Sequence, residues 1–156
     1  MEGFEHYEYT VDENFDQFEF ESDGPKGKIQ KIVKLRYVTR NMYLISFGDL
    51  DPITRRLNDK AISNNSDTAK VVFTLAKIIL DFTELFPEAR LFFTGSTKSR
   101  TRLYQMMINK YRDMIQTIFT IDAYYNGEEE TFILGRNYNS FVVSRKKMNY
   151  YFNFDK

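Results

Sequence analysis

The stretch DTAKVVFTLAKIILDFTELF, residues 67–86, decides the fold. Its polar residues recur every three or four positions, and nearly all residues between them are Val, Phe, Leu, Ala or Ile. This period predicts a helix that lies largely buried across a sheet. Ser66 or Asp67 is expected to cap this helix, and Pro87 to end it.

Apolar stretches flank this helix on both sides, at Met42–Gly48 and Arg90–Thr94. A long helix between two apolar strands is typical of a right-handed crossover, so we expect these two strands to be parallel. The remaining pattern predicts antiparallel strands at Gln17–Glu21 and Lys28–Thr39, a loop over 49–65, a helix over about Arg100–Met114, a hairpin of Thr117–Tyr125 with Thr131–Leu134 around Asn126-Gly127, and a last strand at Phe141–Arg145.

These elements together predict an α+β fold. The sheet is mostly antiparallel with one parallel β-α-β crossover, the order is β-β-β-α-β-α-β-β-β, and there are two main helices. The aromatic residues are expected to be structural, with Tyr150, Tyr151, Phe152 and Phe154 packed back on the body and with Phe18, Phe20, Phe47, Phe73, Phe92, Phe119 and Phe141 mostly buried.

Length and composition exclude several classes of protein. At 156 residues, one domain over 1–156 is expected, with a core that needs no disulfide or metal. Cysteine is absent and His6 is the single histidine, which excludes thiol catalysis and Cys–zinc or multi-His sites. With no apolar run long enough for a bilayer and no signal-peptide pattern, a cytoplasmic domain is expected.

The zero net charge hides an asymmetry along the chain. Residues 1–23 hold nine of the 22 acids and no Lys or Arg, so the remainder carries 22 basic against 13 acidic side chains. An acidic arm could shield a basic surface or mimic nucleic acid. We favour ordinary pairing across a hairpin, because Phe18 and Phe20 alternate with acids while the next strand is rich in Lys.

A cluster of hydroxyls and cations precedes the second helix. It consists of Gly95, Ser96, Thr97, Lys98, Ser99, Arg100 and Arg102. A helix start offers unpaired N–H groups and the positive end of the helix dipole, which suits a phosphate, sulfate or carboxylate. In the alternative interpretation, Ser96 or Ser99 merely caps the helix and the arginines make surface ion pairs.

If the crossover forms, Gly48-Asp49, Asn64–Asp67 and Gly95–Arg102 meet at one sheet edge, where open α/β sheets commonly bind ligands. The candidate site therefore also includes Asp49, Asn65, Asp67 and Tyr104. We predict no metal ligands, because carboxylates in turns usually cap backbone groups. We assign no catalytic residue and no cofactor from these residues.

Several blocks carry a family resemblance, above all Gly95-Ser96-Thr97 followed by Arg100-Thr101-Arg102-Leu103-Tyr104. With Phe47-Gly48-Asp49, Asn64–Asp67 and Tyr138–Phe141, this order resembles a family of single-domain Bacteroidota proteins without an assigned activity. The resemblance covers nearly the whole chain. It implies a bacterial host and no mechanism.

A second resemblance is to the acetyl-CoA-dependent N-acetyltransferase fold. That fold runs antiparallel strands, helix, strand, helix and hairpin, and its second helix carries a Leu-Tyr that resembles Leu103-Tyr104. This resemblance implies Tyr104 as a general acid. The glycine-rich pyrophosphate loop of that fold is missing here, which puts coenzyme A binding in doubt.

Three functions follow, and whether the chain is an enzyme stays open. The first is a non-catalytic binding domain for an anionic ligand or partner at residues 95–102. The second is a diverged coenzyme A-dependent N-acyltransferase, and the third is a nucleic-acid-associated accessory protein with a basic patch at Arg145, Lys146 and Lys147. A phosphate-bearing or carboxylate ligand is expected, membrane binding is not, and nucleic acid is not excluded.

Overall fold

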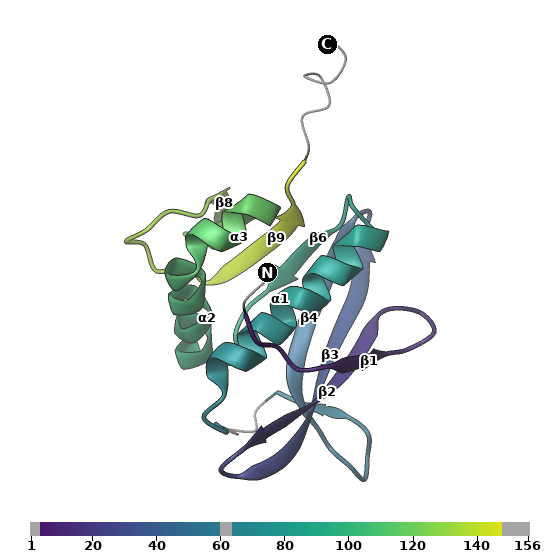
Figure 1. Ribbon diagram of the computed structural model, residues 1–156. Helices are drawn as coiled ribbons and strands as arrows, with labels where there is room; N and C mark the ends of the chain where they lie inside the picture. The colour runs from purple at the N-terminus through teal and green to yellow at the C-terminus, as the bar shows by residue number, and fades with distance from the viewer. Residues whose placement is uncertain (1–3, 60–63, 148–156) are drawn as a thin grey trace.

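The computed structural model describes residues 4–59 and 64–147, which form an α+β fold with the helices on one face of a sheet (Figure 1). The elements are β1 (Tyr9–Val11), β2 (Gln17–Gly24), β3 (Gly27–Thr39), β4 (Met42–Leu50), β5 (Leu57–Asn58), α1 (Thr68–Leu85), β6 (Arg90–Phe93), α2 (Lys98–Lys110), α3 (Arg112–Ile118), β7 (Phe119–Tyr125), β8 (Glu128–Thr131) and β9 (Ser140–Arg145). The aromatic residues Tyr150–Phe154 lie outside the described residues.

Within these ranges the strands form one sheet in the order β1-β2-β3-β4-β6-β9-β7-β8, with β5 paired to β4. The predicted crossover is confirmed, since Met42–Leu44 of β4 pairs in parallel with Arg90–Phe92 of β6. All other strand pairs are antiparallel. The parallel contact is short, and it joins two larger antiparallel half-sheets.

Helix α1 crosses the first half-sheet and also reaches the second (Figure 1). Its Ile78 and Phe82 are fully buried against Phe18 of β2 and Leu91 of β6. A separate cluster in the second half-sheet includes Phe141 and residues of α2 and β7. Ile79 of α1 packs against both clusters, so this helix connects the two cores.

The predicted burial of the phenylalanines is largely confirmed. Those that are buried are Phe18, Phe20, Phe73, Phe119 and Phe141, and those that are half-buried are Phe47 and Phe92. Truncating a buried Phe to Ala typically costs about 3–5 kcal/mol, so this aromatic core dominates the packing. None of the described helices is both long and apolar enough to span a membrane.

Several elements differ from the prediction. Strand β1 was not predicted, and β5 lies within the predicted loop over 49–65. The second helix ends at Lys110, and a third, short helix α3 takes residues 112–118 that were assigned partly to a strand. Asn126 and Gly127 both have positive φ, so a two-residue turn pairs Tyr125 directly with Glu128. The second hairpin strand is therefore Glu128–Thr131, and its glutamates are strand residues instead of the expected turn.

The acidic N-terminal region packs on the fold as the pairing interpretation expects. Glu21 forms an ion pair with Lys28, at 3.7 Å, and Glu19 pairs with Arg55, at 2.9 Å. Further upstream, the Tyr7 backbone N–H donates to Thr74 Oγ1 of α1 at 2.8 Å. Two of the acids of this region, Glu19 and Glu21, thus form ion pairs within the described structure.

Candidate functional site

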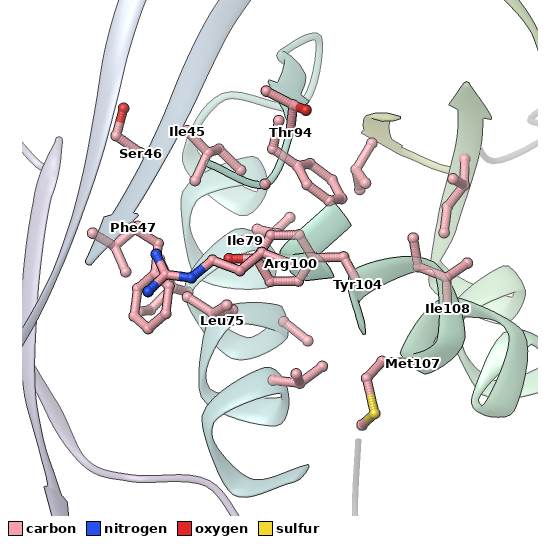
Figure 2. Close-up of a pocket in the computed structure, with 18 of the residues that line it drawn as sticks. Ile45, Ser46, Phe47, Leu75, Ile79, Thr94, Arg100, Tyr104, Met107 and Ile108 are labelled. Atoms are coloured by element: carbon pink, nitrogen blue, oxygen red, sulfur yellow. The ribbon is translucent and has the colours of Figure 1, made fainter. Parts of the chain in front are cut away.

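Strands β4 and β6 separate just after their short parallel contact, and a cavity of about 230 Å³ fills the space between them. Helices α1 and α2 close its sides. The walls are mostly apolar and include Ile45 and Phe47 of β4, Leu75 and Ile79 of α1, and Met107 and Ile108 of α2 (Figure 2). The cavity is large for an interior, because native cores leave few voids bigger than one water molecule.

A second hollow, of about 320 Å³, lies at the sheet edge. It is lined by residues of all three loops that the sequence predicts to converge: Gly48 and Asp49, Asn64, Asn65 and Asp67, and Ser99 and Arg100. We call it the outer cleft, and the first one the inner cavity. Phe47, Arg100 and Tyr104 line both, so they stand where the two spaces meet.

Arg100 occupies this junction. Figure 2 shows its side chain extended past Tyr104 toward Phe47. Its guanidinium donates to the Asp59 carbonyl and, at 2.9 Å, to Ser96 Oγ. Ser96 Oγ also donates to the Asp59 carbonyl, at 2.8 Å. Arg100 therefore holds a cation at the mouth of an apolar cavity.

The cap of α2 differs from the one that the alternative sequence interpretation expects. Thr97, and neither Ser96 nor Ser99, accepts the Arg100 backbone N–H at 3.2 Å. Gly95 is required by close packing, because a Cβ there would lie 2.3 Å from the Thr101 backbone nitrogen. Lys98 is exposed.

Arg102 points away from both hollows. Its guanidinium donates to Gln105 Oε1 and to the Tyr138 carbonyl, each at 3.0 Å. Gln105 is itself buried and accepts the Tyr138 backbone N–H at 3.0 Å. Arg102 thus tethers the loop before β9 to α2 and lines neither the inner cavity nor the outer cleft.

The start of α1 is occupied by the chain's own carboxylate. Asp67 Oδ2 accepts the Tyr7 hydroxyl at 2.6 Å and the Ser22 hydroxyl at 2.5 Å. Neighbouring Asn65 is buried, donates to Ser22 Oγ and the Gly27 carbonyl, and accepts the Lys26 N–H at 2.7 Å. Asn65 is therefore a clamp on the β2–β3 turn: its side-chain amide holds this turn by these three hydrogen bonds.

Asp49 pairs with Lys31, a lysine of the strand that the sequence analysis describes as rich in Lys. Lys31 faces Asp49 across β3 and β4, is only 5% exposed, and has its ammonium group 5.9 Å from the Phe47 ring centroid. The signal was available, because Lys31 shares the parity of Val33 and Leu35, which face the helices. This pair forms part of the outer cleft wall.

Tyr104 carries the only hydroxyl group among the described aromatic side chains of the inner cavity. Figure 2 shows its ring crossing the cavity from α2 toward α1. Burial raises the pKa of Tyr104, and the charge of Arg100 partly offsets this. The hydroxyl makes no hydrogen bond to another residue of 4–59 or 64–147. It is a polar group available to a bound molecule.

Other candidates have structural partners. Within the described ranges no group of three or more His, Cys, Asp or Glu side chains could hold a metal. Asp51 accepts the Ile53 and Thr54 backbone N–H groups, which lowers its pKa. In the proposed basic patch, Arg145 bonds to the Leu80 carbonyl of α1, Lys146 to the Gln116 carbonyl, and Lys147 to Glu88.

Fold and site together define an α+β protein with a two-part cleft, apolar inside and charged outside, between diverging parallel strands. The chain belongs to a family described as "Family of unknown function (DUF6934)", whose model matches residues 4–146. This match supports the expectation of a family without an assigned activity. No curated protein and no solved structure matches the chain.

Proposed function

We propose that this chain is a non-catalytic binding domain for a small amphipathic organic acid. The apolar part of the ligand enters the inner cavity, and its carboxylate or phosphate lies at Arg100 and the start of α2. A bacterial host of the Bacteroidota and a cytoplasmic location remain part of this proposal. The observation that carries it is the position of Arg100 at the junction of an apolar cavity and a polar cleft.

The size of the inner cavity supports an apolar guest. An engineered cavity of about 150 Å³ lined by Leu, Ile and Phe stays dry and binds benzene. The inner cavity is larger, at about 230 Å³, and has similar walls. Water gains few hydrogen bonds there, so a short acyl chain or an aromatic ring is the better occupant.

The mouth supports an acidic head group. The Arg100 guanidinium stands at this mouth, where it donates to the Asp59 carbonyl and to Ser96 Oγ. Hydrogen bonds from a guanidinium to a carboxylate or phosphate are roughly twice as strong as those between neutral groups. Ser99 of the first turn of α2 lines the same cleft, so the helix dipole adds to the attraction.

Calorimetric titration with straight-chain carboxylates of increasing length, and with the matching alcohols, tests the proposal. Affinity for the acids should rise roughly fourfold per CH₂, corresponding to about 0.8 kcal/mol, until the inner cavity is full. Arg100→Gln should lower the affinity for the acids at least about tenfold and leave the affinity for the alcohols nearly unchanged. Arg102→Gln, two residues away at a side chain that lines neither hollow, is the matched control.

Two results would contradict this function. If chain length has no effect on affinity, the inner cavity is not the site. A second contradicting result is that Arg100→Gln lowers the melting temperature but changes the affinities for acids and alcohols equally. Arg100 would then only tether the chain at Asp59. Inorganic phosphate alone should stabilise the protein weakly, because it gains nothing from the inner cavity.

A diverged coenzyme A-dependent N-acyltransferase is the second proposal. The specific observation in its favour is the Tyr104 hydroxyl, which has no partner in the described residues and lies in a cavity between parallel strands. Asp67 at the α1 start opposes it, because a carboxylate there repels a pyrophosphate. Calorimetry with coenzyme A, comparing wild type with Tyr104→Phe, separates this activity from acid binding.

A further inference from the structure

The sheet has a second face, which the three helices leave uncovered (Figure 1). The register places Leu44, Phe92 and Val142 side by side on this face, on the neighbouring strands β4, β6 and β9. Leu44 and Phe92 are half-buried, Val142 is fully buried, and the Phe92 ring contacts Tyr124 at 5.7 Å between centroids. The centre of this outer face is therefore an apolar strip.

Opposite charges stand at the two ends of this strip. Arg36 of β3 pairs with Leu44, and Asp122 of β7 pairs with Val142, so the row across the sheet is Arg36, Leu44, Phe92, Val142, Asp122. The five residues occupy five adjacent strands, with Phe92 in the middle. At about 4.8 Å per strand, the two charges are about 19 Å apart.

The two charged side chains at the ends of this row, Arg36 and Asp122, form no ion pair within the described residues. Arg36 is exposed, and neither its side chain nor that of Asp122 has a hydrogen bond or ion pair with another residue of 4–59 or 64–147. Burial, and next the Glu129 carboxylate, raise the pKa of Asp122, with a partial offset from Arg90. Arg90 itself is paired with Glu129. Asp122 is thus a half-buried acid that would gain from an added cation.

We propose that this outer face binds a second copy of the same chain, in a symmetric dimer whose two-fold axis runs along β6. Such an axis places Arg36 of each copy over Asp122 of the other and Phe92 over Phe92. The half-buried Leu44 of each copy then lies over the strand position of Val142, whose own side chain is buried. The row is self-complementary about its central residue, as an isologous interface requires. Sheets pack face to face in this way at about 10 Å, rotated by about 30°.

This dimer is independent of the proposed ligand function, because it uses the face opposite the inner cavity. Sedimentation equilibrium from about 5 to 300 µM should show a monomer–dimer equilibrium for the wild type. Arg36→Glu and Asp122→Arg should each weaken the dimer at least about tenfold, since each places like charges opposite one another twice per dimer. The double variant Arg36→Glu with Asp122→Arg should restore it.

Circular dichroism and thermal melting establish that each variant is folded, and the exposed Arg36 tolerates change even if Asp122 does not. Glu84→Arg, a charge reversal on the helical side, should leave the dimer constant unchanged. A wild type that stays monomeric up to about 300 µM overturns the proposal. So does a dimer that is insensitive to both reversals, or a folded double variant that stays monomeric.

Discussion

Helices α1 and α2 begin beside the same outer cleft, yet their two starts are chemically opposite. At α1, the Asp67 carboxylate stands at the positive end of the helix dipole, held by Tyr7 and Ser22. At α2, the cap is the neutral hydroxyl of Thr97, and the first turn contains no acid. The Asp67 carboxylate already occupies the positive end of α1. An acidic ligand would therefore be stabilised more at the start of α2.

The largest expected effect concerns the α1 start. Asn65→Ala removes three hydrogen bonds of a residue only 1% exposed and takes this partner from the Lys26 N–H and the Gly27 carbonyl. We expect a loss of about 2–3 kcal/mol in the free energy of unfolding, measured with urea. Asn64→Ala next to it is exposed and should cost well below 1 kcal/mol. Equal losses for both variants would show that Asn65 is no clamp.

A smaller effect is expected at the α2 start. Thr97→Ala removes the side-chain cap and should cost about 1 kcal/mol, whereas Ser99→Ala should cost almost nothing. Asp67 makes no such capping bond to α1. Urea unfolding of the two α2 variants therefore separates Thr97 from Ser99, one of the two serines that the alternative interpretation named as the cap. A larger loss for Ser99→Ala would contradict the observed cap.

The smallest effect is a pH dependence at the α1 start. Burial, and next the hydrogen bond to Asp67, raise the pKa of Tyr7 above its ordinary 10.0. The unfolded chain then loses this proton first, so the stability is fully present below pH 10 and falls as pH rises through the folded pKa. Tyr7→Phe should lose less stability than the wild type between about pH 9 and 11. Parallel curves would show that Tyr7 does not contribute.

Sequence periodicity was sufficient for the crossover and the buried helix, because α1 is long and strongly amphipathic. It failed at the hairpin after β7, where hydrophobicity favoured Thr131–Leu134 as a strand. The turn geometry of Asn126-Gly127 decided instead, since a two-residue loop pairs the residues directly beside it. The break between α2 and α3 at Tyr111 has no Gly or Pro to signal it.

For the candidate site, topology predicted which loops meet, but not which side chains turn inward. Arg100 and Arg102 are two residues apart on one helix, so they point to different sides, and only packing decides which one faces the cleft. The inner cavity was not predictable, because its volume depends on how Phe47, Leu75 and Met107 fail to fill the space. Lys31, by contrast, follows from strand parity alone.

The short parallel contact between β4 and β6 has a consequence for how the molecule can move. Each half-sheet contributes most of one buried cluster, and the seam between them is held by three residue pairs, by α1, and by Leu91 of β6, which packs into the first cluster. Widening this seam breaks far fewer hydrogen bonds than unfolding either half. The inner cavity lies along the seam, so whatever fills it joins two semi-independent bodies and sets the angle between them.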